Sequence, residues 1–92
     1  MSTNVDKIRD RAKIIVNNIA FGDTRINGTK VLRAIDINNP KYIADFSFDT
    51  SINRFIQISS TFAEGKRKYE MLYLVERNKE ELLEVLMNAK VL

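Results

Sequence analysis

The sequence contains no cysteine and no histidine, and this absence restricts the chemistry that the chain can perform. Without cysteine there are no disulfides, thiolate nucleophiles or cysteine zinc sites, and without histidine the commonest metal ligand and general base is missing. An enzyme built on this chain would have to work through Asp, Glu, Lys, Tyr, Ser or Thr alone. We therefore expect a protein with no catalytic residues, no metal site and no cofactor.

Motifs that bind phosphates or metals are also missing. The three glycines are scattered along the chain, so they cannot build a phosphate-binding loop. The aspartates Asp36, Asp45 and Asp49 do not have the spacing of a calcium-binding loop. These patterns leave binding of a macromolecule as the class of function to consider.

Long apolar runs are absent as well. No run approaches the roughly 18 to 20 residues that span a bilayer. The N-terminal stretch MSTNVDKIRDRAK lacks the apolar region of a secretory signal. We expect a soluble, cytoplasmic protein that does not contact a membrane.

The composition is that of an ordinary globular protein. The 92 residues are 45% hydrophobic and 29% charged, which predicts a single domain over residues 1–92. The net charge of +3 is unevenly distributed: residues 1–33 carry seven Lys or Arg against three Asp, whereas residues 64–92 carry six cations and six carboxylates. This asymmetry favours an anionic partner.

The N-terminal segment has apolar residues at the 3, 4, 3, 4 spacing of an amphipathic helix. These residues are Val5, Ile8, Ala12, Ile15 and Ile19. Thr3 is suited to the N-cap position, with Asp6 at N3, and Gly22 is suited to end the helix. The pattern predicts a helix over residues 4–21.

The next segment combines a hairpin turn with an alternating strand. Asn27-Gly28 is a strong signal for a type I′ turn, because both residues tolerate positive φ. The alternation that follows predicts a strand over residues 30–37. A short helix with Thr29 as its N-cap is the competing interpretation. Residues 38–41 then form a turn that includes Pro40.

Three strand-like runs occupy residues 42–76. Alternating apolar residues predict strands over residues 42–49 and 54–62, joined by a short loop. A turn at residues 63–66 then leads to a third predicted strand, residues 67–76. This strand differs from the other two because Leu72 and Leu74 make its second face apolar. Either one of the chain's own helices covers that face, or a partner does.

The C-terminal segment predicts a second helix. Asn78 is suited to the N-cap position with Glu81 at N3. An apolar stripe then runs through Leu82, Val85, Leu86 and Ala89, and Lys90 stands near the end. The predicted fold is therefore α+β: an N-terminal helix, a four-stranded antiparallel meander and a C-terminal helix, with both helices on one face of the sheet.

The predicted hairpin tip between the last two strands is the candidate binding site. It carries three cations and an aromatic ring, and a further cation and ring lie on the neighbouring strand: Lys66, Arg67, Lys68 and Tyr69, with Arg54 and Phe55. Single-stranded DNA or RNA needs cations for its phosphates and rings on which its bases stack. These residues therefore predict a single-stranded nucleic-acid binder, unless the charges only keep a turn soluble.

The alternative hypothesis is a protein-binding regulator or inhibitor, of the type that phages and mobile elements carry. It would use Leu72 and Leu74, or an exposed strand edge, to bind a protein partner or a second copy of the chain.

Overall fold

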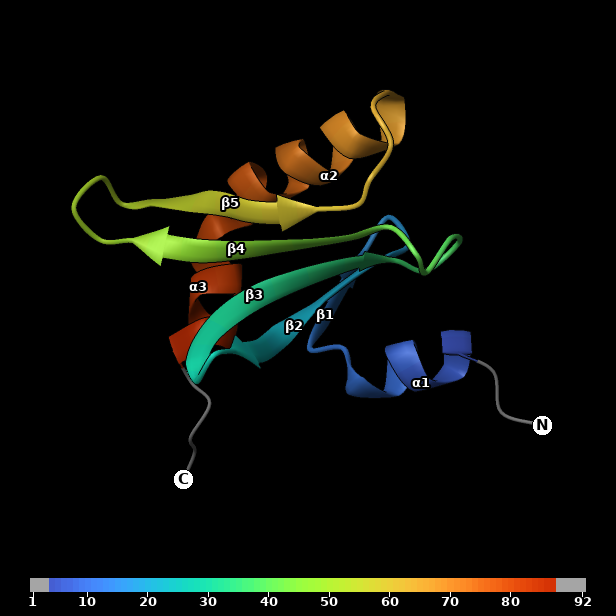
Figure 1. The fold of residues 1–92 in the computed structure, drawn as a ribbon, viewed down its shortest axis with the longest axis horizontal. Helices are drawn as coiled ribbons and strands as arrows, with labels where there is room; N and C mark the ends of the chain where they lie inside the picture. Colours follow the sequence, from blue (N-terminus) through green and yellow to red (C-terminus); the bar gives the residue numbers. More distant parts are fainter. Residues whose placement is uncertain (1–3, 88–92) are drawn as a thin grey trace.

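The computed structural model describes residues 4–87 and consists of a five-stranded antiparallel sheet with three helices (Figure 1). The strands are β1 (Ile14–Val16), β2 (Ile19–Ile26), β3 (Thr29–Asp36), β4 (Ile43–Asp49) and β5 (Arg54–Ser60). The helices are α1 (Asn4–Arg11), α2 (Lys66–Arg77) and α3 (Lys79–Met87). Strand order follows chain order, so the α+β class and the meander are confirmed, with five strands in place of the predicted four.

The register of the strands gives the sheet two distinct faces. Phe21 pairs with Ala34, which pairs with Ala44, and these residues share one face. We call it the core face; its buried residues are Ile19, Phe21, Leu32, Ala34, Ala44 and Phe46. The residues between them form the opposite face, which we call the open face. It includes Gly22, Arg33, Ile35, Ile43 and Asp45.

The core face is covered by α2 and α3. Their buried residues Met71, Leu74, Val75 and Leu82 pack with Phe62 against the strands. Helix α1 lies apart from them near β1 and β2 (Figure 1), and its residues line a cavity together with residues of the open face. The prediction that both terminal helices share one face is therefore wrong. Helix α1 is only eight residues long, and Lys13 already pairs with Phe21 of β2, so the helix stays at the end of the sheet.

The helix predicted over residues 4–21 ends at Arg11, and the rest of that prediction is wrong. Ile14, Ile15 and Val16 are consecutive β-branched residues, which favour a strand over a helix. Asn17 and Asn18 then adopt φ of 50° and 61°, the conformation of a tight hairpin turn. The helical spacing of the apolar residues was coincidental.

The strand predicted over residues 67–76 is also wrong, because this segment is helix α2. Its buried residues, Met71, Leu74 and Val75, follow helical spacing, and its Lys, Arg, Glu, Met and Leu residues have high helix propensity. Gly65, with φ of 137°, precedes the helix where a hairpin turn was predicted. The basic segment that begins at Lys66 is therefore the first turn of a helix.

The remaining elements agree with the sequence patterns. Asn27 and Gly28 have φ of 51° and 82° and connect β2 to β3, which confirms the predicted turn and strand and excludes a short helix at Thr29. Strands β4 and β5 match the predicted runs, with a bulge opposite Asp45 and Phe46.

The last helix is confirmed as α3, but Asn78 does not act through its side chain as a cap of that helix. The side-chain Nδ2 of Asn78 instead donates to the Leu74 carbonyl oxygen at 2.9 Å, at the end of α2. Thr3, Ala89 and Lys90, to which the sequence assigned helical roles, lie outside the described residues. Within residues 4–87, no helix has both the length and the apolar character needed to cross a bilayer.

Candidate functional site

Arg67, the central cation of the predicted binding segment, is held by carboxylates of its own chain. Its Nε donates to Asp36 Oδ2 at 2.8 Å and its Nη2 to Asp36 Oδ1 at 3.1 Å, while Nη1 donates to Glu70 Oε1 at 2.8 Å. The side chain of Asp36 is 4% exposed. The hydrogen bond with Asp36 raises the pKa of Arg67, so the guanidinium stays charged.

The same guanidinium also binds the turn between β1 and β2. Its Nη2 donates to the carbonyl oxygens of Asn17 at 2.9 Å and Asn18 at 3.2 Å. Arg67 thus connects the start of α2, the end of β3 and this turn. To bind a phosphate, this guanidinium would have to give up its existing hydrogen bonds. We therefore assign Arg67 a structural role.

The charge of Lys68 is also neutralised locally. Its Nζ lies 2.7 Å from Glu64 Oε2, and the Tyr69 hydroxyl donates to Glu64 Oε1 at 3.1 Å. The Lys68 ammonium, and then the Tyr69 hydroxyl, lower the pKa of Glu64, and the hydrogen bond with Glu64 raises the pKa of Lys68. Lys66 is the exposed cation of the segment for which residues 4–87 provide no carboxylate or carbonyl partner.

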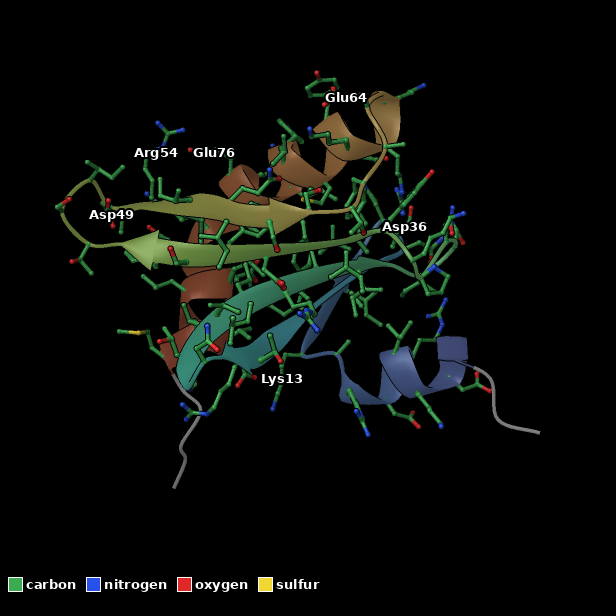
Figure 2. All side chains as sticks on the ribbon, viewed as in Figure 1. Lys13, Asp36, Asp49, Arg54, Glu64 and Glu76 are labelled. Atoms are coloured by element: carbon green, nitrogen blue, oxygen red, sulfur yellow. The ribbon has the colours of Figure 1, made fainter. Side chains whose placement is uncertain are left out.

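Arg54 and Phe55 lie on β5 and have different surroundings. Arg54 Nη2 is 3.7 Å from Glu76 Oε1 of α2, and both side chains are 61% exposed (Figure 2). Phe55 is half-buried, with its ring 5.0 Å from that of Phe48 and 6.5 Å from that of Phe46. Of the predicted aromatic pair, only Tyr69, which is 59% exposed, presents its ring to solvent.

The two leucines predicted to contact a partner pack against the core. Leu74 is 4% exposed and belongs to the core cluster, and Leu72 is half-buried against it. The apolar second strand face to which they were assigned does not exist, because the segment is helical. The chain's own residues bury Leu74.

Tyr73 and Arg77 belong to an exposed stripe of α2 that the predicted strand over residues 67–76 did not include as one surface. Tyr69, Tyr73 and Arg77 are four residues apart, so they follow one another along the outer side of α2. Tyr73 is 58% exposed, and Arg77 Nη1 donates to its hydroxyl at 3.2 Å. Reading the segment with helical spacing would have revealed this stripe.

Strand β5 is an edge of the sheet. It pairs with β4 on one side only, and Ile56 and Ile58 are 40% and 49% exposed. Charged residues, proline and β-bulges usually protect such edges. In β5, Arg54 is the only charged residue and no proline is present, so the bulge is its main protection. The bulge opposite Asp45 and Phe46 is its one irregularity.

Tyr69, Tyr73 and Arg77 on α2, together with Arg54, Ile56 and Ile58 on β5, form what we call the α2–β5 surface. The Arg54–Glu76 pair connects its two elements. Residues 4–87 contain no group of three or more Asp or Glu side chains placed to hold a metal ion. No family model matches this chain, and neither a curated protein nor a solved structure matches it.

Proposed function

We propose that this chain is a non-catalytic protein-binding module that uses the α2–β5 surface, and that the partner favoured by β5 is a second copy of the chain. The observation that carries the proposal is the juxtaposition of an edge strand that has only one charged residue and one bulge with exposed tyrosines and arginines on the neighbouring helix. Tyrosine and arginine are enriched among the residues that dominate protein interfaces. An edge strand adds main-chain hydrogen bonds to such a contact.

The sequence of β5 is complementary to itself in the antiparallel direction. A two-fold axis at Gln57 sets Ile56 opposite Ile58 of the second copy, and Arg54 opposite Ser60. A parallel arrangement in register would place Arg54 beside Arg54, which is unfavourable. Antiparallel pairing therefore brings the exposed isoleucines together and keeps the like charges apart.

Single-stranded nucleic-acid binding, which the sequence predicted for this region, stays a prediction with less support. Phosphate binding needs available cations, and in this segment Arg67 and Lys68 already have carboxylate partners. Lys66, Tyr69 and the 61% exposed Arg54 retain the required chemistry, but two cations and one ring make a small site.

Sedimentation-velocity mass measurements over a range of protein concentrations test the proposal. We expect the unmodified chain to dimerise and the Ile56→Lys/Ile58→Lys variant to be monomeric, because lysines on an edge strand oppose pairing. Ile15→Lys is the matched control, since Ile15 is a 41% exposed strand isoleucine outside β5; this variant should still dimerise.

A chain that stays monomeric at every concentration would contradict the proposal. Binding of a single-stranded oligonucleotide that weakens steeply with salt and is lost in Lys66→Glu would favour the nucleic-acid alternative instead.

A further inference from the structure

A cavity of about 400 Å³ lies between α1 and the open face of the sheet. Its residues come from two directions. Lys7, Ile8 and Arg11 belong to α1. Arg33, Ile35 and Ile43 lie on the open face of the sheet. This volume falls in the usual range of small-molecule sites, roughly 300 to 1,000 Å³.

The α1 side of the cavity carries two available cations. Lys7 and Arg11 are four residues apart, so they lie on the same side of the helix. Both are exposed, and no salt bridge or hydrogen bond within residues 4–87 engages either side chain. They differ in this respect from Arg67 and Lys68, whose charges are already paired.

The sheet side carries a cation that is fixed in position. Arg33 Nε and Nη2 donate to Asp45 Oδ1 and Oδ2 at 2.8 and 3.0 Å. The hydrogen bond with Asp45 raises the pKa of Arg33, so it stays charged. These contacts leave Nη1 for another acceptor. Asp23 is the one carboxylate among the residues that line the cavity, and Asp45 pairs with Arg33, so the three cations Lys7, Arg11 and Arg33 still exceed these two carboxylates.

The surface between these cations is apolar. Ile8, Ile35 and Ile43 are half-buried, so part of each side chain remains accessible to a ligand. Gly22, also in the lining, adds no side chain to the space. The cavity therefore combines a cationic rim with an apolar floor.

We propose that this cavity binds a small organic anion. Lys7 and Arg11 hold its carboxylate or phosphate group with help from Arg33, and its apolar body lies on Ile35 and Ile43. The chain has no histidine or cysteine, and the ligand is bound without being changed. This site uses different residues from the α2–β5 surface, so the two proposals stand or fall separately.

Titration of the isotope-labelled full chain with phenyl phosphate, followed by NMR, tests the site. We expect the amide signals of residues 7–12, 20–24, 33–35 and 43 to shift. Inorganic phosphate lacks the apolar ring and phenol lacks the charged group, so each should bind at least about tenfold more weakly than phenyl phosphate. A tenfold change in affinity corresponds to about 1.4 kcal/mol.

The Lys7→Gln/Arg11→Gln variant should weaken phenyl phosphate binding by about tenfold or more, since it removes two charge-assisted contacts. Arg9→Gln is the matched control because Arg9 lies on the same helix outside the cavity lining; its affinity should stay within about twofold of the unmodified chain. Circular dichroism would establish that both variants fold.

Three results would overturn the proposal. The first is a titration in which no cavity amide shifts. The second is a folded Lys7→Gln/Arg11→Gln variant with unchanged affinity. The third is inorganic phosphate binding as tightly as phenyl phosphate, which would leave the apolar floor without a role.

Discussion

The two faces of the sheet are built from the same strands but perform different tasks. On the core face, Phe21, Leu32 and Ala34 are fully buried beneath α2 and α3. On the open face, Ile35 and Ile43 are only half-buried and border the cavity below α1. Because side chains alternate along a strand, one face can supply stability while the other stays accessible for contacts.

Each face also contains a buried aspartate paired with an arginine, and the pairs differ in their surroundings. Asp36 and Asp45 are 3% and 4% exposed. Asp36 binds Arg67, which has further partners on α2 and the β1–β2 turn. Asp45 binds Arg33, which is more exposed and whose own strand lies beside β4. The first pair joins distant elements, whereas the second joins neighbouring strands.

The largest difference between the faces should come from apolar truncations. Phe21→Ala removes a fully buried ring from the core face and should lower the free energy of unfolding by about 3 to 5 kcal/mol. Ile35→Ala on the open face should lower it by about 1 to 2 kcal/mol, because the side chain is already half exposed to water. Urea denaturation measures both, and equal losses would show that the faces are packed alike.

Breaking the Asp36 pair should have the next largest effect. Arg67→Gln leaves a buried carboxylate without its partner, and we expect a loss of about 2 to 3 kcal/mol, below that of a fully buried pair because Arg67 is partly exposed. Lys66→Gln is the control one residue earlier and should change stability by less than about 0.5 kcal/mol. An Arg67 variant as stable as the control would contradict the structural role of this residue.

The Asp45 pair should contribute less. In Arg33→Gln we expect a loss of about 1 to 2 kcal/mol, since Arg33 is the more exposed arginine and Arg67 has further partners in Glu70 and the Asn17 and Asn18 carbonyls. Each aspartate keeps one other donor, Ser59 for Asp45 at 3.3 Å and the Asn38 N–H for Asp36 at 2.9 Å. Comparison with Arg67→Gln in the same urea experiment ranks the two pairs. The reverse order would mean that the open face is the more tightly organised one.

The smallest effect concerns the exposed Glu64. The pKa of this carboxyl is lowered in the folded chain by Lys68 and then by Tyr69. It therefore stabilises the fold above the pH at which a free glutamate titrates, and this contribution is lost as the pH falls through the folded-state pKa. Glu64→Gln should flatten the acid side of the stability profile slightly, as thermal melts from pH 3 to pH 7 would detect. An unchanged profile would indicate that solvent screens the pair.

The sequence patterns identified most of the sheet because local signals there agree with the fold. Asn27-Gly28 specifies its turn, and the alternation of residues 42–49 matches a strand with one buried face. Asn17-Asn18 is a turn of the same kind, but the helical spacing of Ile8, Ala12 and Ile15 concealed it. Two competing periodicities in one segment cannot be resolved without the tertiary contacts that select between them.

The candidate site was less predictable for the same reason. Residues 66–77 fit both the two-residue period of a strand and the 3.6-residue period of a helix. The strand period is seen in Tyr69, Met71, Tyr73 and Val75, and the helical spacing in Met71, Leu74 and Val75. The strand interpretation placed the buried Leu74 and the half-buried Leu72 on an exposed face, and it separated Tyr73 from Arg77. The partners of Arg67 lie on β3 and in the β1–β2 turn, far away in the chain, so no local pattern could reveal that its charge is already used.

The contacts of Arg67 also bear on the order in which the chain folds. They join residues 31 and 50 positions apart in the sequence, whereas each turn of the meander joins neighbouring strands. Closing long loops is entropically unfavourable, so local hairpins form readily before such contacts exist. We expect the meander to be assembled in the transition state and α2 to dock afterwards. Substitutions at Arg67 should then accelerate unfolding and leave the folding rate nearly unchanged.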